Sequence, residues 1–172
     1  MTSFTTESGI KVRPLKNKRD RKALLRLVKT LPEWFDAEDH REMSEDLIDD
    51  PGLVAEMDGQ RVGFVTWFKP ACKPAPHRTE LTWLAVHRNV HGKGVGKALI
   101  QGLEQTLLKQ ESGPVELMVW TMAESAPIPE YAATRAFYHK CQFKDWFVDT
   151  ENPEQWGGER LFLRKTLRGQ ES

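Results

Sequence analysis

The apolar residues of the first fifty positions follow the spacing of helices. In the first run they recur every three or four residues through a charged segment, and the run ends at Pro32. A second run is closed by Asp50-Pro51-Gly52. We therefore predict two amphipathic helices, with buried positions at Leu24, Leu27, Val28 and Leu31 in the first and at Met43, Leu47 and Ile48 in the second.

Strand-like segments lie on either side of these helices. Residues 11–15 suit a short opening strand, and residues 53–57 and 62–68 suit two more. Asp58-Gly59 between the last two is typical of a tight hairpin turn. Residues 70–76 are rich in proline and predict a loop, after which residues 80–86 predict a strand that leads directly into a glycine-rich turn.

The second half of the chain alternates between helix and strand. The helix after the glycine turn is stopped by Gly113-Pro114, and strands are predicted at 115–119, 143–148 and 161–165. The predicted order is βααβββαβαββ, an α/β fold around one sheet. The core-facing helix positions are Val95, Ala98, Leu99, Gly102, Leu103 and Leu107 after the turn, and Ala133, Ala136, Phe137 and Cys141 in the later helix.

Size and charge narrow the classes of function. The 172 residues suit one domain, which we place at 10–167 between flexible tails at 1–9 and 168–172. Twenty-five basic and 25 acidic residues cancel, so the sequence predicts binding neither to nucleic acid nor to a membrane surface. Without a membrane-length apolar run or a leader segment, we expect a cytoplasmic protein. Cys72 and Cys141 lack metal-ligand spacing, so no metal is predicted.

The glycine-rich turn carries the clearest chemistry. His91-Gly92-Lys93-Gly94-Val95-Gly96-Lys97 connects the strand at 80–86 to a helix. Such a turn presents unpaired backbone N–H groups and the positive end of the helix dipole to an anion. The glycines allow close approach, and Lys93 and Lys97 add positive charge, so the segment suits a diphosphate.

Spacing excludes two common nucleotide motifs. A P-loop needs glycine six residues before Lys97 and Ser or Thr after it, whereas His91 and Ala98 occupy these positions. A dinucleotide fingerprint needs a third glycine three residues after a Gly-x-Gly pair. Neither Gly92-x-Gly94 nor Gly94-x-Gly96 is followed by one. A turn that only connects strand to helix remains the alternative to an anion site.

The segment from Leu84 to Leu99 resembles the coenzyme A motif of the GCN5-related N-acetyltransferase (GNAT) superfamily. Gly94 and Gly96 match its glycine positions, and His91 stands where Gln or Arg is usual. A second block, from Tyr131 to Phe143, is similar to a later helix of the family, with Phe-Tyr in place. Tyr131 and Gln142 stand where Asn and Gly are usual.

This resemblance implies the fold and the cofactor. The family has a mixed, mostly antiparallel and splayed sheet flanked by helices, with coenzyme A between the strands predicted at 80–86 and 115–119. Parted strands leave backbone groups free to bind a peptide-like pantetheine arm. The implied contacts with acetyl-coenzyme A are Leu84, Ala85, Val86, His91, Gly92, Lys93, Gly94, Val95, Gly96, Lys97 and Thr134. Leu84 and Val86 equally suit an ordinary buried strand.

Acetyl transfer to an amine needs a neutral amine, a stabilised oxyanion and a proton for the departing thiolate. Tyr138 matches the tyrosine that many members use as the acid; the alternative is a tyrosine packed beside Phe137. Glu80 lies where relatives often place a carboxylate near the acceptor, and it is a candidate base through water. The alternative is a solvated glutamate at a strand end.

The sequence does not identify the molecule that accepts the acetyl group. Trp34 and Phe35 lie in a connection and, with Glu80, are candidate contacts for the acceptor. The leading hypothesis is an N-acetyltransferase acting on a primary amine of a small molecule, amino acid, antibiotic or peptide. One alternative is a non-catalytic acetyl-coenzyme A sensor or interaction module, and another is a protein N-terminal or lysine acetyltransferase. The sequence also leaves a homodimer open.

Overall fold

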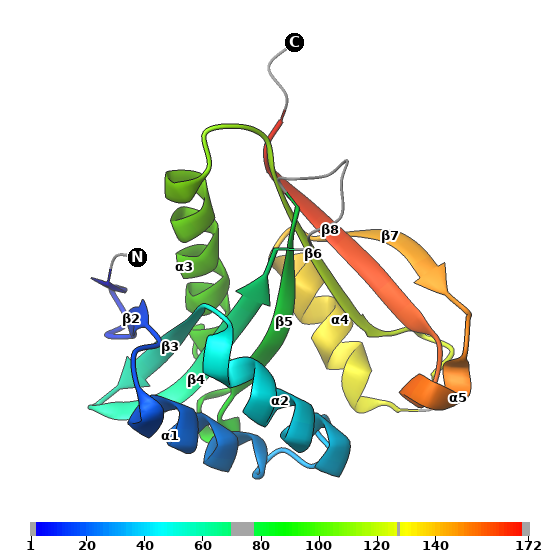
Figure 1. Ribbon diagram of the computed structural model, residues 1–172, viewed down its shortest axis with the longest axis horizontal. Coiled ribbons are helices and arrows are strands. Elements are labelled where there is room, and N and C mark those ends of the chain that lie inside the picture. The colour runs from blue at the N-terminus through cyan, green and yellow to red at the C-terminus, as the bar shows by residue number, and fades with distance from the viewer. Residues whose placement is uncertain (1–2, 70–77, 127, 170–172) are drawn as a thin grey trace. The chain divides into compact units, whose positions relative to one another are not determined.

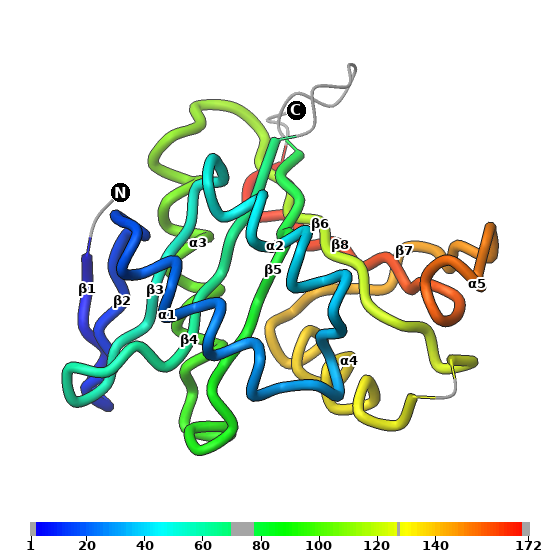
Figure 2. The backbone as a smooth tube through the Cα atoms, turned by 60° about the horizontal axis from the view of Figure 1, so that its bottom comes forward, coloured from blue at the N-terminus to red at the C-terminus, as the bar shows by residue number. Residues whose placement is uncertain are grey.

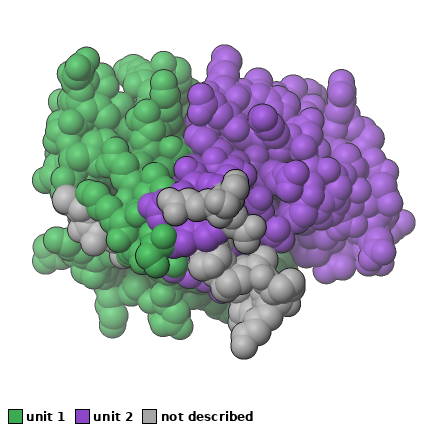
Figure 3. All heavy atoms as spheres, turned by 90° about the horizontal axis from the view of Figure 1, so that it is seen from above, with its two compact units in different colours: residues 1–68, 81–112 green, residues 69–80, 113–172 purple. Residues whose placement is uncertain are grey.

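The computed structural model describes residues 3–69, 78–126 and 128–169. The chain forms two compact units: the first unit comprises residues 1–68 and 81–112, and the second comprises residues 69–80 and 113–172, coloured green and purple in Figure 3. Within the described ranges, eight strands form one sheet in the order β1-β2-β3-β4-β5-β6-β8-β7. The predicted α/β fold around one sheet is therefore confirmed.

The first unit contains the N-terminal strands. β1 (Phe4–Thr5), β2 (Lys11–Pro14), β3 (Gly52–Met57) and β4 (Gln60–Phe68) pair in an antiparallel arrangement, and Figure 2 shows β1 running beside β2. The β3–β4 turn has positive φ at both Asp58, 50°, and Gly59, 73°. Those angles are typical of the tight hairpin turn that the Asp-Gly pair predicts.

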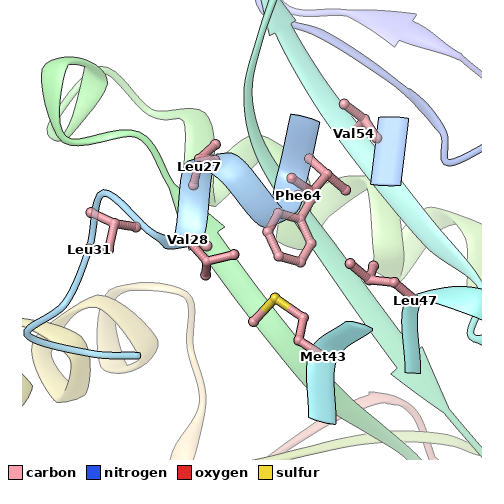
Figure 4. Packing of buried hydrophobic residues seen from close by; sticks show 9 residues of the cluster. Leu27, Val28, Leu31, Met43, Leu47, Val54 and Phe64 are labelled. Atoms are coloured by element: carbon pink, nitrogen blue, oxygen red, sulfur yellow. The ribbon is translucent and has the colours of Figure 1, made fainter. Parts of the chain in front are cut away.

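Helices α1 (Lys18–Val28) and α2 (Ala37–Asp49) begin at side-chain caps. Asn17 caps α1, and Asp36 forms a reciprocal capping box with Asp39 at the start of α2. Their apolar stripes pack on β3, β4 and β5 (Arg78–Val86). Figure 1 shows the two helices beside these strands, and Figure 4 shows helix side chains packed around Val54 and Phe64. The buried cluster consists of Leu24, Leu27, Val28, Leu31, Met43, Leu47, Val54, Phe64 and Ala85.

Helix α3 (Val95–Gln110) follows the glycine turn and packs closely on the strands of the first unit. A Cβ atom at Gly63 of β4 would lie 2.9 Å from the carbonyl oxygen of Ala85 and 3.2 Å from a side-chain carbon of Val95. Glycine at this position therefore lets β4 approach both β5 and α3. All six apolar positions predicted for this helix are buried: Val95, Ala98, Leu99, Gly102, Leu103 and Leu107.

A buried ion-pair network joins distant segments of the first unit. Asp20 of α1 is fully buried and accepts hydrogen bonds from Arg13 of β2 at 2.8 and 2.9 Å. Arg61 of β4 adds a third bond, from Nε to Asp20 Oδ1 at 2.6 Å. The bonds from Arg13 are the main reason that the pKa of Asp20 lies well below its usual range, against the opposing effect of burial.

The second unit contains the C-terminal strands. Residues Arg78, Thr79 and Glu80 of β5 pair in parallel with β6 (Val115–Met122), which pairs antiparallel with β8 (Arg160–Arg168) and, through it, with edge strand β7 (Lys144–Asp149). Helices α4 (Glu130–Lys140) and α5 (Pro153–Trp156) complete the unit. Alternation buries one side of β6 and β8, at Val115, Leu117, Val119, Leu161 and Leu163.

Several details differ from the sequence prediction. Phe4 and Thr5 form strand β1 inside the segment expected to be a flexible tail. Ile48 is 58% exposed, because α2 turns Met43 and Leu47 inward and Ile48 lies outside that stripe. In α4, Ala133 and Ala136 are exposed, and the buried positions are Tyr138 and the following Cys141. The loop at 70–76, with Cys72, lies outside the described residues.

Candidate active site

The segment before α3 is a compact turn with its own hydrogen bonds. The short helix η1 (Arg88–Val90) is followed by N–H bonds from His91 to the Arg88 carbonyl, 3.1 Å, and from Lys93 to the Val90 carbonyl, 3.2 Å. Gly92 and Gly94 have φ of 75° and 86°, and no atom lies within 4 Å of a Cβ built at either one. Backbone conformation, rather than crowding, therefore favours glycine at both positions.

The start of α3 leaves backbone donors available. Gly94 is the N-cap, and no side chain caps the helix. The N–H groups of the first helical turn, at Val95, Gly96 and Lys97, have no partner inside the helix, because the first intrahelical bond is donated by Ala98 to the Gly94 carbonyl. Residues 91–94 are exposed. The helix start therefore offers uncapped donors and a positive dipole end to an anion.

Fewer backbone N–H groups of the turn are available to bind an anion than the sequence predicts. The N–H groups of His91 and Lys93 are engaged inside the turn. Their predicted contribution through backbone donors is therefore not available in this conformation. The side chains of Lys93 and Lys97 are exposed and can supply charge.

His91 also contacts two other parts of the first unit. Its Nε2 lies 2.8 Å from the carbonyl oxygen of Val86 at the end of β5, and its ring meets that of Trp34 edge to face, with centroids 6.0 Å apart. Arg88 forms an ion pair with Glu33 and lies over the Trp34 ring, 5.8 Å from its centroid. This hydrogen-bonded Arg88 lowers the pKa of Glu33. The connection between α1 and α2 is thus tied to the turn before α3.

Trp34 and Phe35, the residues predicted to contact the acceptor, are partly buried against the core of the first unit. Phe35 packs on Trp83 of β5, with ring centroids 6.3 Å apart, and Trp83 donates from Nε1 to Asp46 of α2 at 2.7 Å. Both aromatic residues therefore have a packing role. Trp34 lies beside the turn through His91, whereas Phe35 lies beside β5.

The strand residues predicted to contact the cofactor have different environments. Ala85 is buried in the core cluster, while Leu84 and Val86 are half-buried. Because His91 uses the carbonyl of Val86, that group is already satisfied. The N–H of His87, next in the chain, bonds to the Val62 carbonyl of β4 at 2.8 Å. The end of β5 is therefore fixed on both sides before any ligand arrives.

Tyr138, Thr134 and Glu80 belong to the second unit. Tyr138 is 5% exposed and packs edge to face on Phe137 and Phe143, with centroids 5.2 and 5.5 Å away. Burial raises the pKa of its phenol, so it stays protonated at neutral pH. Thr134 is half-buried on the same helix.

Glu80 lies opposite Met118 in the parallel pairing of β5 with β6. It is half-buried, and burial raises the pKa of its carboxyl group, an effect that the charge of Arg160 partly offsets. A carboxylate with a raised pKa is a better base than an ordinary surface glutamate. The role of Glu80 as the base stays a prediction.

The sequence did not indicate three features of these units. Arg88 and Glu33 are 55 residues apart, and nothing in the sequence links the two side chains. Arg135 of α4 donates to the carbonyls of Met122 and Ala123, at 2.9 and 3.2 Å, and fixes the start of the β6–α4 connection. Arg160 lies among aromatic rings beside Trp156 of α5, a helix that was not predicted.

Gln142 occupies a conformation that glycine prefers. Its φ is 69°, directly after the last turn of α4, where its N–H bonds to the His139 carbonyl at 2.9 Å. This is the position at which the resembling family usually carries glycine.

The described residues contain no helix long and apolar enough to cross a membrane. Within the same ranges, no group of three or more His, Cys, Asp or Glu side chains is arranged to hold a metal ion.

Comparisons with known proteins identify related sequences and folds. A family model described as an acetyltransferase (GNAT) domain matches residues 49–145. A GNAT-family acetyltransferase from Desulfovibrio desulfuricans is 18% identical, with a TM-score of 0.78 over 92% of this chain and 99% of that chain. An aminoglycoside 6′-N-acetyltransferase complexed with coenzyme A is 17% identical, with a TM-score of 0.69 over 94% and 99%.

The ribosomal-protein-alanine N-acetyltransferase from Brucella melitensis is 24% identical, with a TM-score of 0.67 over 90% of this chain and 98% of that chain. At these identities the likeness shows a shared fold. The comparison with curated proteins gave no match.

Proposed function

The chain belongs to the GNAT family of acetyltransferases, and from this premise we propose that it transfers the acetyl group of acetyl-coenzyme A to a primary amine in a ternary complex. The observation that carries the proposal is the uncapped start of α3 behind an exposed turn with two positive-φ glycines. Such a helix start suits the diphosphate of coenzyme A.

The residues of this turn have separate parts in the proposal. The N–H groups of Val95, Gly96 and Lys97 bind diphosphate oxygens, and Gly92 and Gly94 keep the approach free of side chains. Lys93 and Lys97 add charge at the rim. His91 holds the turn against Val86 rather than the cofactor, which accounts for a histidine where the family usually carries Gln or Arg.

The reaction needs three proton movements. A carboxylate, with Glu80 as our candidate, takes one proton from the acceptor ammonium, through water. The amine nitrogen then bonds to the acetyl carbonyl carbon, and the carbon–sulfur bond of the thioester breaks. The nitrogen loses its second proton to water. The departing thiolate accepts a hydrogen bond from the Tyr138 phenol, which burial keeps protonated, and any proton that the phenol gives to sulfur is replaced from solvent.

The acceptor class is a primary amine of a small molecule, amino acid, antibiotic or peptide. Two proteins of the same fold act, by their names, on an aminoglycoside and on an alanine of a ribosomal protein. These names fit an amine acceptor of either size. Protein N-termini and lysines differ from the other acceptors only in what surrounds the amine.

Two linked measurements test the proposal. Isothermal titration should show binding of acetyl-coenzyme A, and a panel of amines should release free thiol from it. Absence of binding at millimolar acetyl-coenzyme A would overturn the proposal. Binding without thiol release on a wide panel would favour the non-catalytic sensor instead.

A further inference from the structure

An arginine of the second unit is held among aromatic rings. The guanidinium carbon of Arg160, on β8, lies 4.1 Å from the ring centroid of Trp156, 5.3 Å from that of Trp120 and 5.4 Å from that of Phe162. Asp149 of β7 accepts a hydrogen bond from Nη2. We call Arg160, Trp120, Trp156 and Phe162 the arginine–aromatic cluster.

The guanidinium is incompletely bonded. Its Nε atom is buried, and among the described residues no atom accepts a hydrogen bond from it. Asp149 therefore satisfies only one edge of a group that presents five donors in a fixed fork. A buried donor without an acceptor costs stability, so an oxygen atom supplied by a ligand has a site prepared for it.

The cluster lies on the same side of the sheet as Glu80. Along β6, the half-buried Met118 and Trp120 and the buried Met122 alternate with Leu117, Val119 and Thr121, which are all buried. Glu80 pairs with Met118, Trp120 with Phe162, and Met122 with Arg160. Directly paired residues project to the same side of a sheet, so the carboxylate, the aromatic rings and the guanidinium share one face.

The charges on this face are complementary to an α-amino acid. Glu80 and Arg160 interact electrostatically, and Trp120, Trp156 and Phe162 offer partly exposed apolar surface beside them. An acceptor whose amine lies near Glu80 can place a negatively charged group near Arg160. A guanidinium binds a carboxylate through charge-assisted hydrogen bonds, and the negative end of an α-amino acid is a carboxylate.

We propose that the arginine–aromatic cluster binds the carboxylate and apolar side chain of an α-amino acid whose amine is acetylated. The inference rests on the proposed function, since it names the class of acceptor for that reaction. The acceptor carboxylate bonds to the free edge of Arg160, and its side chain packs on the rings. Because Trp156 covers the guanidinium, its ring shifts when the carboxylate enters.

Binding of reaction products tests the inference without requiring turnover. The probes are N-acetyl derivatives of methionine, leucine, phenylalanine and tryptophan, each compared with its carboxamide, with coenzyme A present. Isothermal titration gives both affinities, and tryptophan fluorescence with the non-aromatic probes reports the movement of Trp156. At least one acid should bind tenfold or more tightly than its carboxamide, which has the same shape without the charge.

Two variants separate Arg160 from a general effect of charge. Arg160→Gln should reduce the preference for the acid to less than threefold. Arg164→Gln, on the same strand and face, should keep it, because Arg164 lies over Trp146 and 4.0 Å from Glu116. If Arg160→Gln fails to fold, Arg160→Lys keeps the charge but removes the fork, and should lower the preference severalfold.

Equal binding of acid and carboxamide by the wild type for all four pairs would overturn the inference, as would a preference that survives in the folded Arg160 variant. The outcome is separable from the function itself. Thiol release with amines but no carboxylate preference removes only this inference. Carboxylate preference without thiol release on any amine overturns the acetyl-transfer proposal and leaves the cluster as a carboxylate-binding site without an acceptor role.

Discussion

His91 donates a hydrogen bond from Nε2 to the carbonyl oxygen of Val86, 2.8 Å away, and so closes the glycine turn onto the strand that leads into it. The same ring meets Trp34 edge to face. A side chain at the position where the family usually places Gln or Arg thus acts on the protein's own backbone. The geometry of the turn is established before any cofactor is bound.

Two substitutions of His91 should separate the effect of its hydrogen bond from that of its ring contact with Trp34. His91→Ala removes the bond to Val86 and the contact with Trp34, and should lower the free energy of unfolding by about 1–2 kcal/mol. His91→Gln keeps an N–H donor and should recover part of that loss. Urea denaturation measures both, and equal stability of the alanine and wild-type proteins would contradict the role given to His91.

The effect of a substitution at Gly94 should depend on how readily the new residue adopts a positive φ. It has φ of 86° and open space around it, so Asn, which accepts this conformation, should weaken acetyl-coenzyme A binding only severalfold. Gly94→Val should weaken it far more, because a β-branched residue disfavours positive φ and displaces the helix start. Isothermal titration compares the two, and similar affinities would show that the conformation of Gly94 does not matter for binding.

Gln142 carries a conformational cost that glycine would remove. A non-glycine residue in the left-handed region costs roughly 1–2 kcal/mol, against which the greater freedom of glycine in the unfolded chain costs roughly 0.4–1 kcal/mol. Gln142→Gly should therefore stabilise the protein by about 0.5–1 kcal/mol in urea denaturation. As a control, Gln101→Gly, at an exposed position inside α3, should destabilise it by roughly 1 kcal/mol.

Tyr138 is tested by removal of one oxygen atom. Tyr138→Phe keeps the edge-to-face packing with Phe137 and Phe143, so it should fold normally and bind acetyl-coenzyme A as before. If the phenol assists the thiolate, kcat should fall about a hundredfold. Tyr131→Phe, in the same helix, is the matched control and should leave kcat nearly unchanged. Unchanged turnover in Tyr138→Phe would leave this tyrosine with packing alone.

The Asp20 network should make stability depend on acid pH. The pKa of Asp20 is lowered in the folded protein, chiefly by the hydrogen bonds from Arg13. Its stabilising effect is therefore complete above the unfolded-state pKa, about 4, and is lost as pH falls through the folded value. Asp20→Asn should cost about 3 kcal/mol at pH 7, and the difference from wild type should shrink below pH 4. A pH-independent difference would argue against the ionised pair.

Local patterns predicted elements well where packing and spacing agree. The Asp58-Gly59 hairpin and the buried stripe from Val95 to Leu107 depend on neighbouring residues only, and both are confirmed. Helix α4 was located, but its alanines face outward, because the bulk of Tyr138 sets the packed side. The spacing of small residues does not carry that information.

The candidate site depends on tertiary contacts that the sequence pattern does not predict. The glycine turn could be found from its composition, since positive φ requires particular residues. The bond between His91 and Val86 requires the turn to fold back on its strand. The rings around Arg160 come from β6, β8 and the short α5, and only the register of the strands brings them together.

Gly63 has a consequence for how freely this sequence can vary. Any side chain there would press on the Ala85 carbonyl, 2.9 Å from a Cβ, and on Val95 and Leu99 of α3, at 3.2 and 3.3 Å. The helix would have to shift away from the sheet and would move its first-turn N–H groups with it. Position 63 therefore acts as a spacer of fixed thickness, and a library randomised at this one codon should be depleted of acetyl-coenzyme A binders although residue 63 lies outside the turn.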